Sequence, residues 1–327
     1  MSGSLVLIVA LLLAPVVLVF AFAGCSAFGT ENPPPPGPTT TGPGTTGPGT
    51  TGPGPAKPGD PYRAAILAQP GLMAYWRLAE TAGSIAADSG PLGRNGVYKG
   101  GPTLGQEGAL AAKQPGDTAV LFGGTDDLVE IDVGTVFGLP AGAPDPLLPP
   151  HSFSIEAWMR LASTPGADGF ETVFDSLQNA AGTVRGFSLS VTRGTTPGIL
   201  GFVGNGATGS TLPELIDEVR LDLPAEVLAG AWAHLVLTHE PTGADGRLTL
   251  YLNWVDPASG AARSDVEAAS VKYSRDQAQV QPLRIGAGQD GQGDAVNFFS
   301  GRLDEVALYN TVLAPTVVND HFAMGRA

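Results

Sequence analysis

Asp304 is the acidic residue whose position most requires a partner. It lies in "GRLDEVALYN" (301–310), a stretch whose branched and aromatic residues favour a β-strand. In a regular strand, Asp304 shares one face with Val306 and Leu308, whereas Glu305 points to the other face. If the first face is buried, the carboxylate must gain a partner or a proton, because a buried unpaired charge is costly. We therefore expect Asp304 to stabilise the fold rather than to catalyse a reaction.

Two kinds of partner could satisfy this carboxylate. The first is a calcium ion, which takes oxygen ligands from Asp side chains and loop carbonyls. The candidate calcium ligands are the aspartates of the predicted turns and of the last strand, namely Asp88, Asp126, Asp127 and Asp304. The second is a set of backbone N–H groups or an arginine such as Arg302 or Arg77. Asp126 and Asp127 also suit a simple turn.

The other residue types that could do chemistry are few or badly spaced. His234 and His239 are five positions apart and fall on opposite faces of a strand, which excludes a simple metal pair. His151 and His321 are isolated in the sequence. Cys25 is the only cysteine, so no intrachain disulfide can form. The sequence contains neither a Gly-x-Ser-x-Gly elbow between strand and helix nor a Gly-rich phosphate loop.

The charge of the chain argues against a nucleic-acid ligand. The 327 residues carry 31 acids and 17 Lys or Arg residues, a formal charge of −14. The first 62 residues contribute only Glu31, Asp60 and Lys57, so the remainder has 29 acids against 16 bases, or −13. Binding to DNA or RNA requires a basic face, which this composition does not favour. An acidic composition suits a solvated surface or a calcium site.

The N-terminus indicates a targeting segment rather than a folded element. Residues 5–23 are apolar without a break, and the stretch "FAGC" ends at Cys25. This arrangement resembles a bacterial lipoprotein signal, which would be cut before Cys25 and would leave its sulfur to carry a lipid. The apolar run is also long enough for an uncleaved membrane helix, although Pro15 interrupts it. Ordinary secretion or a misassigned start is the third possibility. All of these place the rest of the chain outside the cytoplasm.

Composition divides the chain into three parts. Residues 1–25 form the predicted signal or lipid-anchor segment, and residues 26–61 form a linker rich in Pro, Gly and Thr. The linker repeats Thr-Thr-Gly-Pro-Gly and has nothing to bury, so we expect it to be a disordered spacer. Residues 62–327 form the predicted folded domain. An anchor followed by a spacer predicts a domain that works at the cell surface.

Strand signals dominate the predicted domain. In "SFSIEAWMRL" (152–161), alternate apolar residues from Phe153 to Leu161 share one face. "WAHLVLTHE" (232–240) and "GRLTLYLNW" (246–254) flank "PTGAD", a predicted hairpin loop. Short helices are predicted at each end, after Asp60 and from Pro315. Segments 134–151 and 204–218 are predicted to be surface loops. The absence of βαβ alternation predicts an all-β, antiparallel, two-sheet sandwich or jelly roll.

The strands also resemble those of a known family. "AYWRLAETAGSIAADSG", "TAVLFGGTDDLVEI", "FSIEAWMRL", "WAHLVLTHE", "GRLTLYLN", "LRIGAG" and "FFSGRLDEVALYNTVLAP" occur in the order seen in laminin-G-like jelly-roll domains of the concanavalin A-like lectin/glucanase superfamily. The resemblance covers about residues 70–325. It implies two packed antiparallel sheets and often a structural calcium ion near the last strand, at Asp304. Members bind glycans or proteins, act as spacers, or hydrolyse polysaccharides.

The resemblance gives a specific test for catalysis. Its laminarinase-like members use Glu-x-Asp-x-x-Glu on one strand, and retaining hydrolysis needs two carboxyl groups about 5–5.5 Å apart. Glu130 and Asp132 match the first two positions, but Gly134 and Thr135 occupy the region where the second Glu belongs. We therefore expect Glu130 and Asp132 to lie on the solvent face of a strand. The incomplete motif predicts a domain that is not an enzyme.

Four tryptophans are candidates for ligand contact or for the core. Trp76, Trp158 and Trp232 lie in strand patterns that match the family and are predicted to be core residues. Trp254 lies at a predicted strand end where the family usually has Gly, so Trp254 and Asn253 are the predicted surface contacts for a ligand. The predicted function is that of an envelope-anchored, non-catalytic binding module for carbohydrate or protein ligands. The alternatives are a passive structural or assembly domain of the envelope and a polysaccharide-active enzyme with an unfamiliar site.

Overall fold

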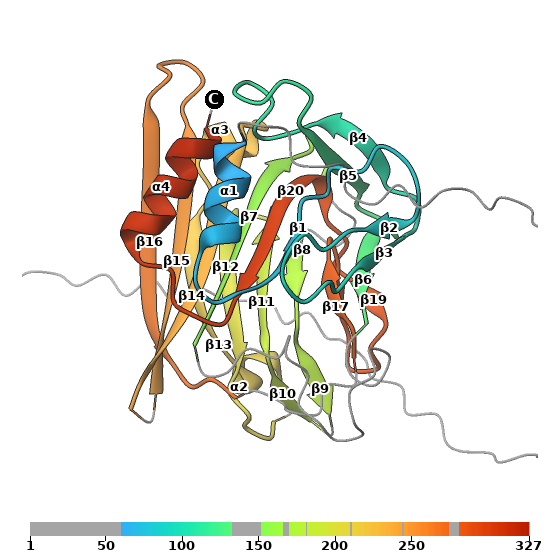
Figure 1. Cartoon of the computed structure of the whole chain (residues 1–327). Coiled ribbons are helices and arrows are strands. Elements are labelled where there is room, and N and C mark those ends of the chain that lie inside the picture. The colour runs from blue at the N-terminus through green and yellow to red at the C-terminus, as the bar shows by residue number, and fades with distance from the viewer. Residues whose placement is uncertain are drawn as a thin grey trace, which may run out of the picture. The chain divides into compact units, whose positions relative to one another are not determined.

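Two large antiparallel sheets form the folded part of the computed structural model (Figure 1). The structure describes residues 60–132, 152–165, 170–180, 182–209, 211–243, 245–274 and 281–326. The predicted signal segment, nearly all of the linker, and the predicted loop 134–151 lie outside these residues. The prediction of an all-β jelly-roll sandwich is confirmed.

Sheet A contains the strands nearest the two terminal helices. Its path runs through β16 (Ala262–Val271), β15 (Asp245–Val255), β14 (Ala233–Thr242), β7 (Phe153–Leu161), β20 (Ser300–Tyr309), β5 (Thr118–Gly123) and β4 (Thr103–Glu107), and β1 (Leu72–Trp76) also pairs with β20. The predicted hairpin is confirmed, because Thr242 pairs with Asp245 at the end of β14 and β15.

Sheet B packs against the inner face of sheet A. Its order is β13 (Ile216–Asp222), β12 (Gly198–Gly204), β11 (Phe187–Thr192), β8 (Phe170–Asp175), β17 (Leu283–Ile285), β6 (Leu128–Ile131), β3 (Gly96–Lys99) and β2 (Ile85–Ala86). Two small hairpins accompany it, β9 (Gln178–Ala180) with β10 (Thr183–Arg185), and β18 (Gly288–Gln289) with β19 (Ala295–Val296). The short helices α2 (Leu212–Leu215) and α3 (Ala225–Leu228) lie in the connections.

Alternation along the strands builds the core between the two sheets. The alternate residues of β7 from Phe153 to Leu161 all belong to this core, as predicted, because successive side chains of a strand point to opposite faces. Trp158 points to the other side of β7, into a second apolar cluster. Sheet A is therefore buried on both faces along β7.

The second cluster lies under two helices on the outer face of sheet A. Helices α1 (Pro61–Ala68) and α4 (Pro315–Gly325) lie side by side across this face (Figure 1). Both begin with proline at the first helical turn, and Asp60 caps α1 by accepting the Arg63 N–H at 2.8 Å. Both predicted helices are confirmed. In the part of the chain that the structure describes, no helix has the length and apolarity needed to cross a membrane.

Two segments differ from the prediction. The stretch 204–218, predicted to be a surface loop, contains α2 and the start of β13. Strand β16 was not predicted, because its sequence "ARSDVEAASV" is mostly polar and most of its side chains are exposed at the edge of sheet A. Its pairing extends the partner strand β15 to Val255.

Candidate functional site

A bulge in β20 determines where its acidic side chains point. Asp304 pairs with Trp158 and Ala307 with Glu156, so β20 carries one more residue than β7 between these pairs. Glu305 adopts the left-handed conformation, with φ of 52°. The bulge lies where β20 changes its neighbour on the opposite side from β5 to β1.

The bulge overturns the predicted orientation of both acids. Leu303 and Val306 both belong to the core between the sheets, so the residues between them are displaced from it. Asp304 instead accepts a hydrogen bond from the Ala109 N–H at 2.8 Å, next to the outer apolar cluster. The prediction that Asp304 shares a face with Val306, with Glu305 on the opposite face, is wrong, because it assumed a regular strand.

Three carboxyl groups and one arginine meet at the bulge. Ligand-type oxygens of Asp117, Asp304 and Glu305, here called the acidic cluster, lie within 4.8 Å of one another. Arg77 Nη2 lies 2.7 Å from Glu305 Oε1 and 3.4 Å from Asp117 Oδ1. It also lies 3.3 Å from Oδ2 of Asp60, the residue that caps α1. Arg77 therefore links the first helix to the last strand.

Burial controls the protonation of the acidic cluster. It raises the pKa of Asp304 well above its ordinary value, and the nearby Asp117 charge raises it further. Burial also raises the pKa of Asp117, against the opposing effects of the Leu110 N–H and Arg77. The pKa of Glu305 is raised by burial and then by Asp60. Two adjacent buried carboxylates cannot both stay charged cheaply, so this arrangement favours a proton held between Asp304 and Asp117.

The acidic cluster does not fit a calcium ion. Calcium takes about 6–8 oxygen ligands. Five of the six carboxylate oxygens are already in contact with Arg77, with Tyr75 or with a backbone N–H group. Asp304 Oδ1 is the remaining oxygen, and it has no hydrogen-bond partner among the described residues. The arrangement favours the predicted alternative in which a backbone amide holds Asp304 and Arg77 supplies the positive charge.

The other predicted calcium ligands do not join Asp304. Asp88 accepts hydrogen bonds from the N–H groups of Tyr75, Gly90 and Arg94, at 2.6 to 2.7 Å. Asp127 Oδ2 accepts from the Gly123 N–H at 2.7 Å. Asp126 is exposed and accepts from the Thr125 hydroxyl. These three aspartates organise local turns, and in the described residues the converging carboxyl groups include none of them.

Glu130 and Asp132 lie at the end of β6, and Glu130 is engaged by basic side chains. Glu130 lies on β6 with its side chain beside Lys99 and 3.6 Å from Arg284 Nη2. Val129 and Ile131 on the same strand are fully buried, so Glu130 is on the face away from the core, as expected. Asp132 is exposed just after the strand. Positions 134 and 135 lie outside the described residues.

Trp254 and Asn253 are not surface residues. Trp254 is 7% exposed and belongs to the core between the sheets, and Asn253 is 1% exposed on the opposite face of β15. The predicted surface contact is wrong, because β15 pairs with β16 as far as Val255 and alternation therefore continues through Trp254. Trp76 and Trp158 are buried, as predicted. Trp232 is only partly buried, which departs from its predicted place in the core.

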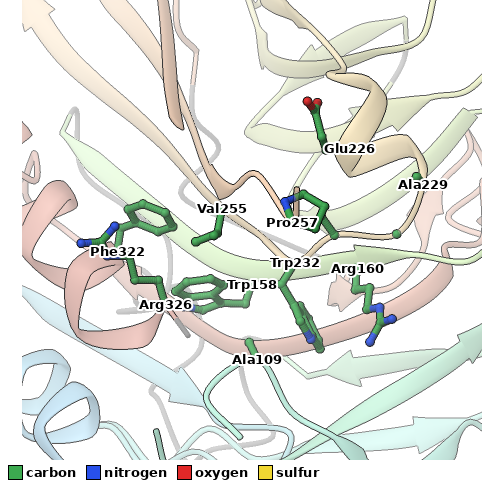
Figure 2. A pocket seen from close by; sticks show the side chains of 12 residues that line it. Ala109, Trp158, Arg160, Glu226, Ala229, Trp232, Val255, Pro257, Phe322 and Arg326 are labelled. Carbon is green, nitrogen blue, oxygen red and sulfur yellow. The ribbon is translucent and has the colours of Figure 1, made fainter. Parts of the chain in front are cut away.

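A pocket of about 390 Å³ opens around Trp232, at the end of α4 and on the outer face of sheet A (Figure 2). We call it the Trp232 pocket. Its large apolar and charged lining residues are Trp158, Trp232, Phe322, Arg160, Arg326 and Glu226. Figure 2 shows the Trp232 ring between Trp158 and Arg160, with Glu226 toward the opposite rim. Pockets of this size with an aromatic floor and a few charged groups typically hold small ligands.

Strand geometry places these side chains together. Trp158 and Arg160 lie on the outer face of β7, on either side of the inward-facing Met159. Met159 pairs with Ala233, so Trp232, the residue before Ala233, lies close to the same end of β7. Phe322 of α4 stacks on Trp158, with ring centroids 5.8 Å apart. The aromatic floor is therefore built from two neighbouring strands and the last helix.

A buried hydrogen-bond network supports this floor from below. Glu156 Oε2 lies 3.1 Å from His234 Nε2 and 3.0 Å from His321 Nδ1, and Glu156 Oε1 accepts a hydrogen bond from the Tyr309 hydroxyl. The His234 ring contacts Trp158, with centroids 5.1 Å apart. No local sequence pattern indicates this network, because its members are far apart along the chain.

The network shifts the pKa values of its members. Burial alone would raise the pKa of Glu156, but the hydrogen bonds from His234 and His321 outweigh it and lower the pKa to about 2. Burial lowers the pKa of His234. Glu156 raises the pKa of His321 against the effect of burial. The contact between Glu156 on β7 and His321 on α4 therefore attaches α4 to sheet A.

Comparison with known proteins defines the family. The family model described as the concanavalin A-like lectin/glucanases superfamily, of laminin-G type, matches residues 140–319, which is more than half of the chain. The chain belongs to this superfamily, and the resemblance inferred from its strands is confirmed. A comparison with curated proteins gave no match.

Solved structures with similar folds are distant in sequence. The binding domain of botulinum neurotoxin serotype D/C VPI 5993 is 12% identical, with a TM-score of 0.45 over 78% of this chain and 52% of that chain. The CBM40 of Ruminococcus gnavus IT-sialidase, bound to α2,3 sialyllactose, is 16% identical, with a TM-score of 0.37 over 61% of this chain and 96% of that chain. This chain thus spans about half of the toxin domain, and these likenesses concern the fold alone.

Proposed function

We propose that the domain is a non-catalytic carbohydrate-binding module and that the Trp232 pocket is its binding site. The observation that supports this is a partly exposed Trp ring over a preformed aromatic floor, with charged side chains on both sides. The apolar C–H face of a sugar ring packs on an aromatic ring, and its hydroxyl groups bond to charged side chains. The floor is held by the Glu156 network, so little ordering is needed when a ligand binds.

The charges of the pocket support binding rather than hydrolysis. Glycoside hydrolysis generally needs two carboxyl groups on either side of the scissile bond. Glu226 is the only carboxylate that lines the Trp232 pocket in the described part of the chain. The acidic cluster is fully or largely buried and is bonded internally, so it is not available to a polymeric substrate. Release of reducing sugar from polysaccharides by the purified protein would favour the enzyme alternative.

A carbohydrate microarray followed by calorimetry tests the proposal. The variant Trp232→Ala should lose most of the affinity of the wild type for any glycan identified and should keep its melting temperature, because Trp232 is only partly buried. Val266→Ala is the matched control, since Val266 is 53% exposed on the edge strand β16. Equal binding by Trp232→Ala and wild type would reject the pocket. Absence of binding to any glycan would favour the passive structural alternative or a protein ligand.

We further propose that the N-terminal segment holds this module at the outer surface of the cell envelope through a lipid on Cys25. The support is the apolar run before Cys25 and the Pro/Gly/Thr spacer after it. Metabolic labelling with an alkyne fatty acid should label the wild type, and Cys25→Ser should lose both the label and membrane retention. A Cys25→Ser protein that stays in the membrane fraction would indicate an uncleaved helix instead.

A further inference from the structure

Three arginines surround the Trp232 pocket, although the chain as a whole is acidic. Arg160 and Arg326 line the pocket. Arg302 pairs with Arg160 across β20 and β7, so both side chains lie on the outer face of sheet A. The acids near them are Glu226 and Glu107. The charged residues that line the pocket itself are two arginines and one glutamate, a sum of +1, in a chain whose formal charge is −14.

Arg160 is free to bind an anion. Its guanidinium is 3.9 Å from Glu107, which is beyond hydrogen-bond distance, and the Glu107 side chain is 70% exposed. Glu107 is also shared with Arg302, which lies 3.8 Å away. The Arg160 side chain itself is 40% exposed. A weak, solvated ion pair of this kind contributes little and is easily replaced by a ligand.

The positions of the arginines match a charged sugar. In the view of Figure 2 the Arg160 guanidinium lies beside the Trp232 ring, and Arg326 lies across the pocket with Phe322. The Arg326 guanidinium carbon is 5.9 Å from the centre of the Phe322 ring. A guanidinium binds a carboxylate through two parallel N–H groups, a geometry that a hydroxyl group cannot use fully. A sugar stacked on Trp232 would thus present a ring carboxylate to Arg160.

We propose that the Trp232 pocket selects acidic oligosaccharides, in which a sugar stacks on Trp232 and its carboxylate pairs with Arg160. This inference rests on the proposed carbohydrate-binding function. It predicts weaker binding of neutral glycans, because these have no carboxylate to pair with Arg160. The net charge of the chain works against this preference at long range, so the selectivity depends on short-range contacts.

The experiment compares each acidic glycan with its own neutral form. Hyaluronan oligosaccharides and oligogalacturonates are titrated into the full chain by calorimetry, before and after chemical reduction of their carboxyl groups. The wild type should bind at least one acidic form about tenfold or more tightly than its reduced form. Raising the salt concentration should reduce this difference, because the pocket is open to solvent.

Variants then locate the effect. Arg160→Gln should remove the preference for the acidic form and keep the weaker binding of the reduced form, whereas Trp232→Ala should weaken both. Arg160→Lys should restore part of the preference. Arg247→Gln is the matched control, because it removes the same charge from an exposed position at the opposite end of β15 from Val255. Thermal melting of each variant identifies any that is misfolded.

The outcomes separate this inference from the proposed function. Equal binding of the acidic and reduced forms by the wild type would overturn the inference and leave carbohydrate binding intact. A preference that is lost equally in Arg160→Gln and Arg247→Gln would also overturn it, because a general field rather than the pocket would then be responsible. Binding of neither form, together with no binding on the microarray, would reject both proposals.

Discussion

The variant Asp304→Asn should become more stable relative to the wild type as pH rises. Asp304 is fully buried, and burial together with Asp117 raises its pKa, so the folded protein keeps a proton that the unfolded chain releases. Asp304→Asn imitates this protonated form. The amide oxygen can accept the Ala109 N–H, now 2.8 Å from Asp304 Oδ2, and the amide N–H can donate to Asp117.

The size of the effect follows from proton linkage. A group whose pKa is raised by folding loses stabilising free energy as pH rises above its unfolded value, which is 3.8 for Asp304. The loss is about 1.4 kcal/mol per pH unit until the folded pKa is reached. Because Asn does not titrate, the variant avoids this loss. The free energy of unfolding of Asp304→Asn relative to wild type should therefore rise by about 1.4 kcal/mol for each pH unit in that window.

Urea denaturation between pH 4 and pH 8 measures this difference, and the same titrations with EDTA or calcium test the metal alternative. We expect a difference that grows with pH and does not depend on EDTA. If Asp304 instead bound calcium, EDTA would lower the stability of the wild type, and Asp304→Asn would destabilise the protein at neutral pH. Either of those results would refute the protonated-pair interpretation. Val266→Ala is the control with no expected pH dependence.

Three further predictions follow from buried groups. Glu171→Gln should lower the free energy of unfolding, measured by urea denaturation, by about 3–5 kcal/mol, because Glu171 is fully buried and Arg193 contacts both its oxygens at 2.7 Å. A loss below about 1 kcal/mol would contradict this. Trp254→Ala should lower the free energy of unfolding by about 3–5 kcal/mol, because it leaves a cavity in the core, and the glycan affinity of the folded protein should stay unchanged. Lost affinity with normal stability would instead identify Trp254 as a ligand contact. Acid should destabilise the protein as pH falls from about 4.5 toward 2. Folding lowers the pKa of Glu156 from 4.5 to about 2, so the charged carboxylate stabilises the folded state above pH 4.5, and this contribution is lost as Glu156 becomes protonated. Circular dichroism during acid titration would show this transition, which Glu156→Gln should flatten; an identical slope in Glu156→Gln would remove Glu156 as its cause.

Much of the fold could be predicted because, along strands such as β7, the apolar residues of the core alternate with mostly polar residues. Strands β7 and β14 and the hairpin to β15 lie at the predicted positions. The two helices begin at Pro61 and Pro315, where proline fixes the first turn, and Asp60 also caps the first of them. These signals are local, so one sequence is enough to detect them.

The site could not be predicted, because it depends on pairings between distant segments. The bulge at Asp304 and Glu305 is set by the change of neighbour from β5 to β1, which no local pattern encodes. The strand β16 decides that Trp254 is buried, yet its sequence is polar. Trp232 is partly buried because it precedes β14, outside the paired residues of the strand.

The position of β20 has a consequence for folding. This strand, the last one along the described chain, lies inside sheet A and pairs with β7 on one side and with β5 and β1 on the other. Contacts such as Tyr75 with Glu305 join residues 230 positions apart. Loop closure over such distances is slow. Sheet A and the outer apolar cluster under α1 both need residues of β20, so neither is complete until this last strand has formed. A chain emerging from the ribosome N-terminus first therefore cannot complete sheet A until residue 309 is available. Until then its unpaired strand edges are exposed to aggregation.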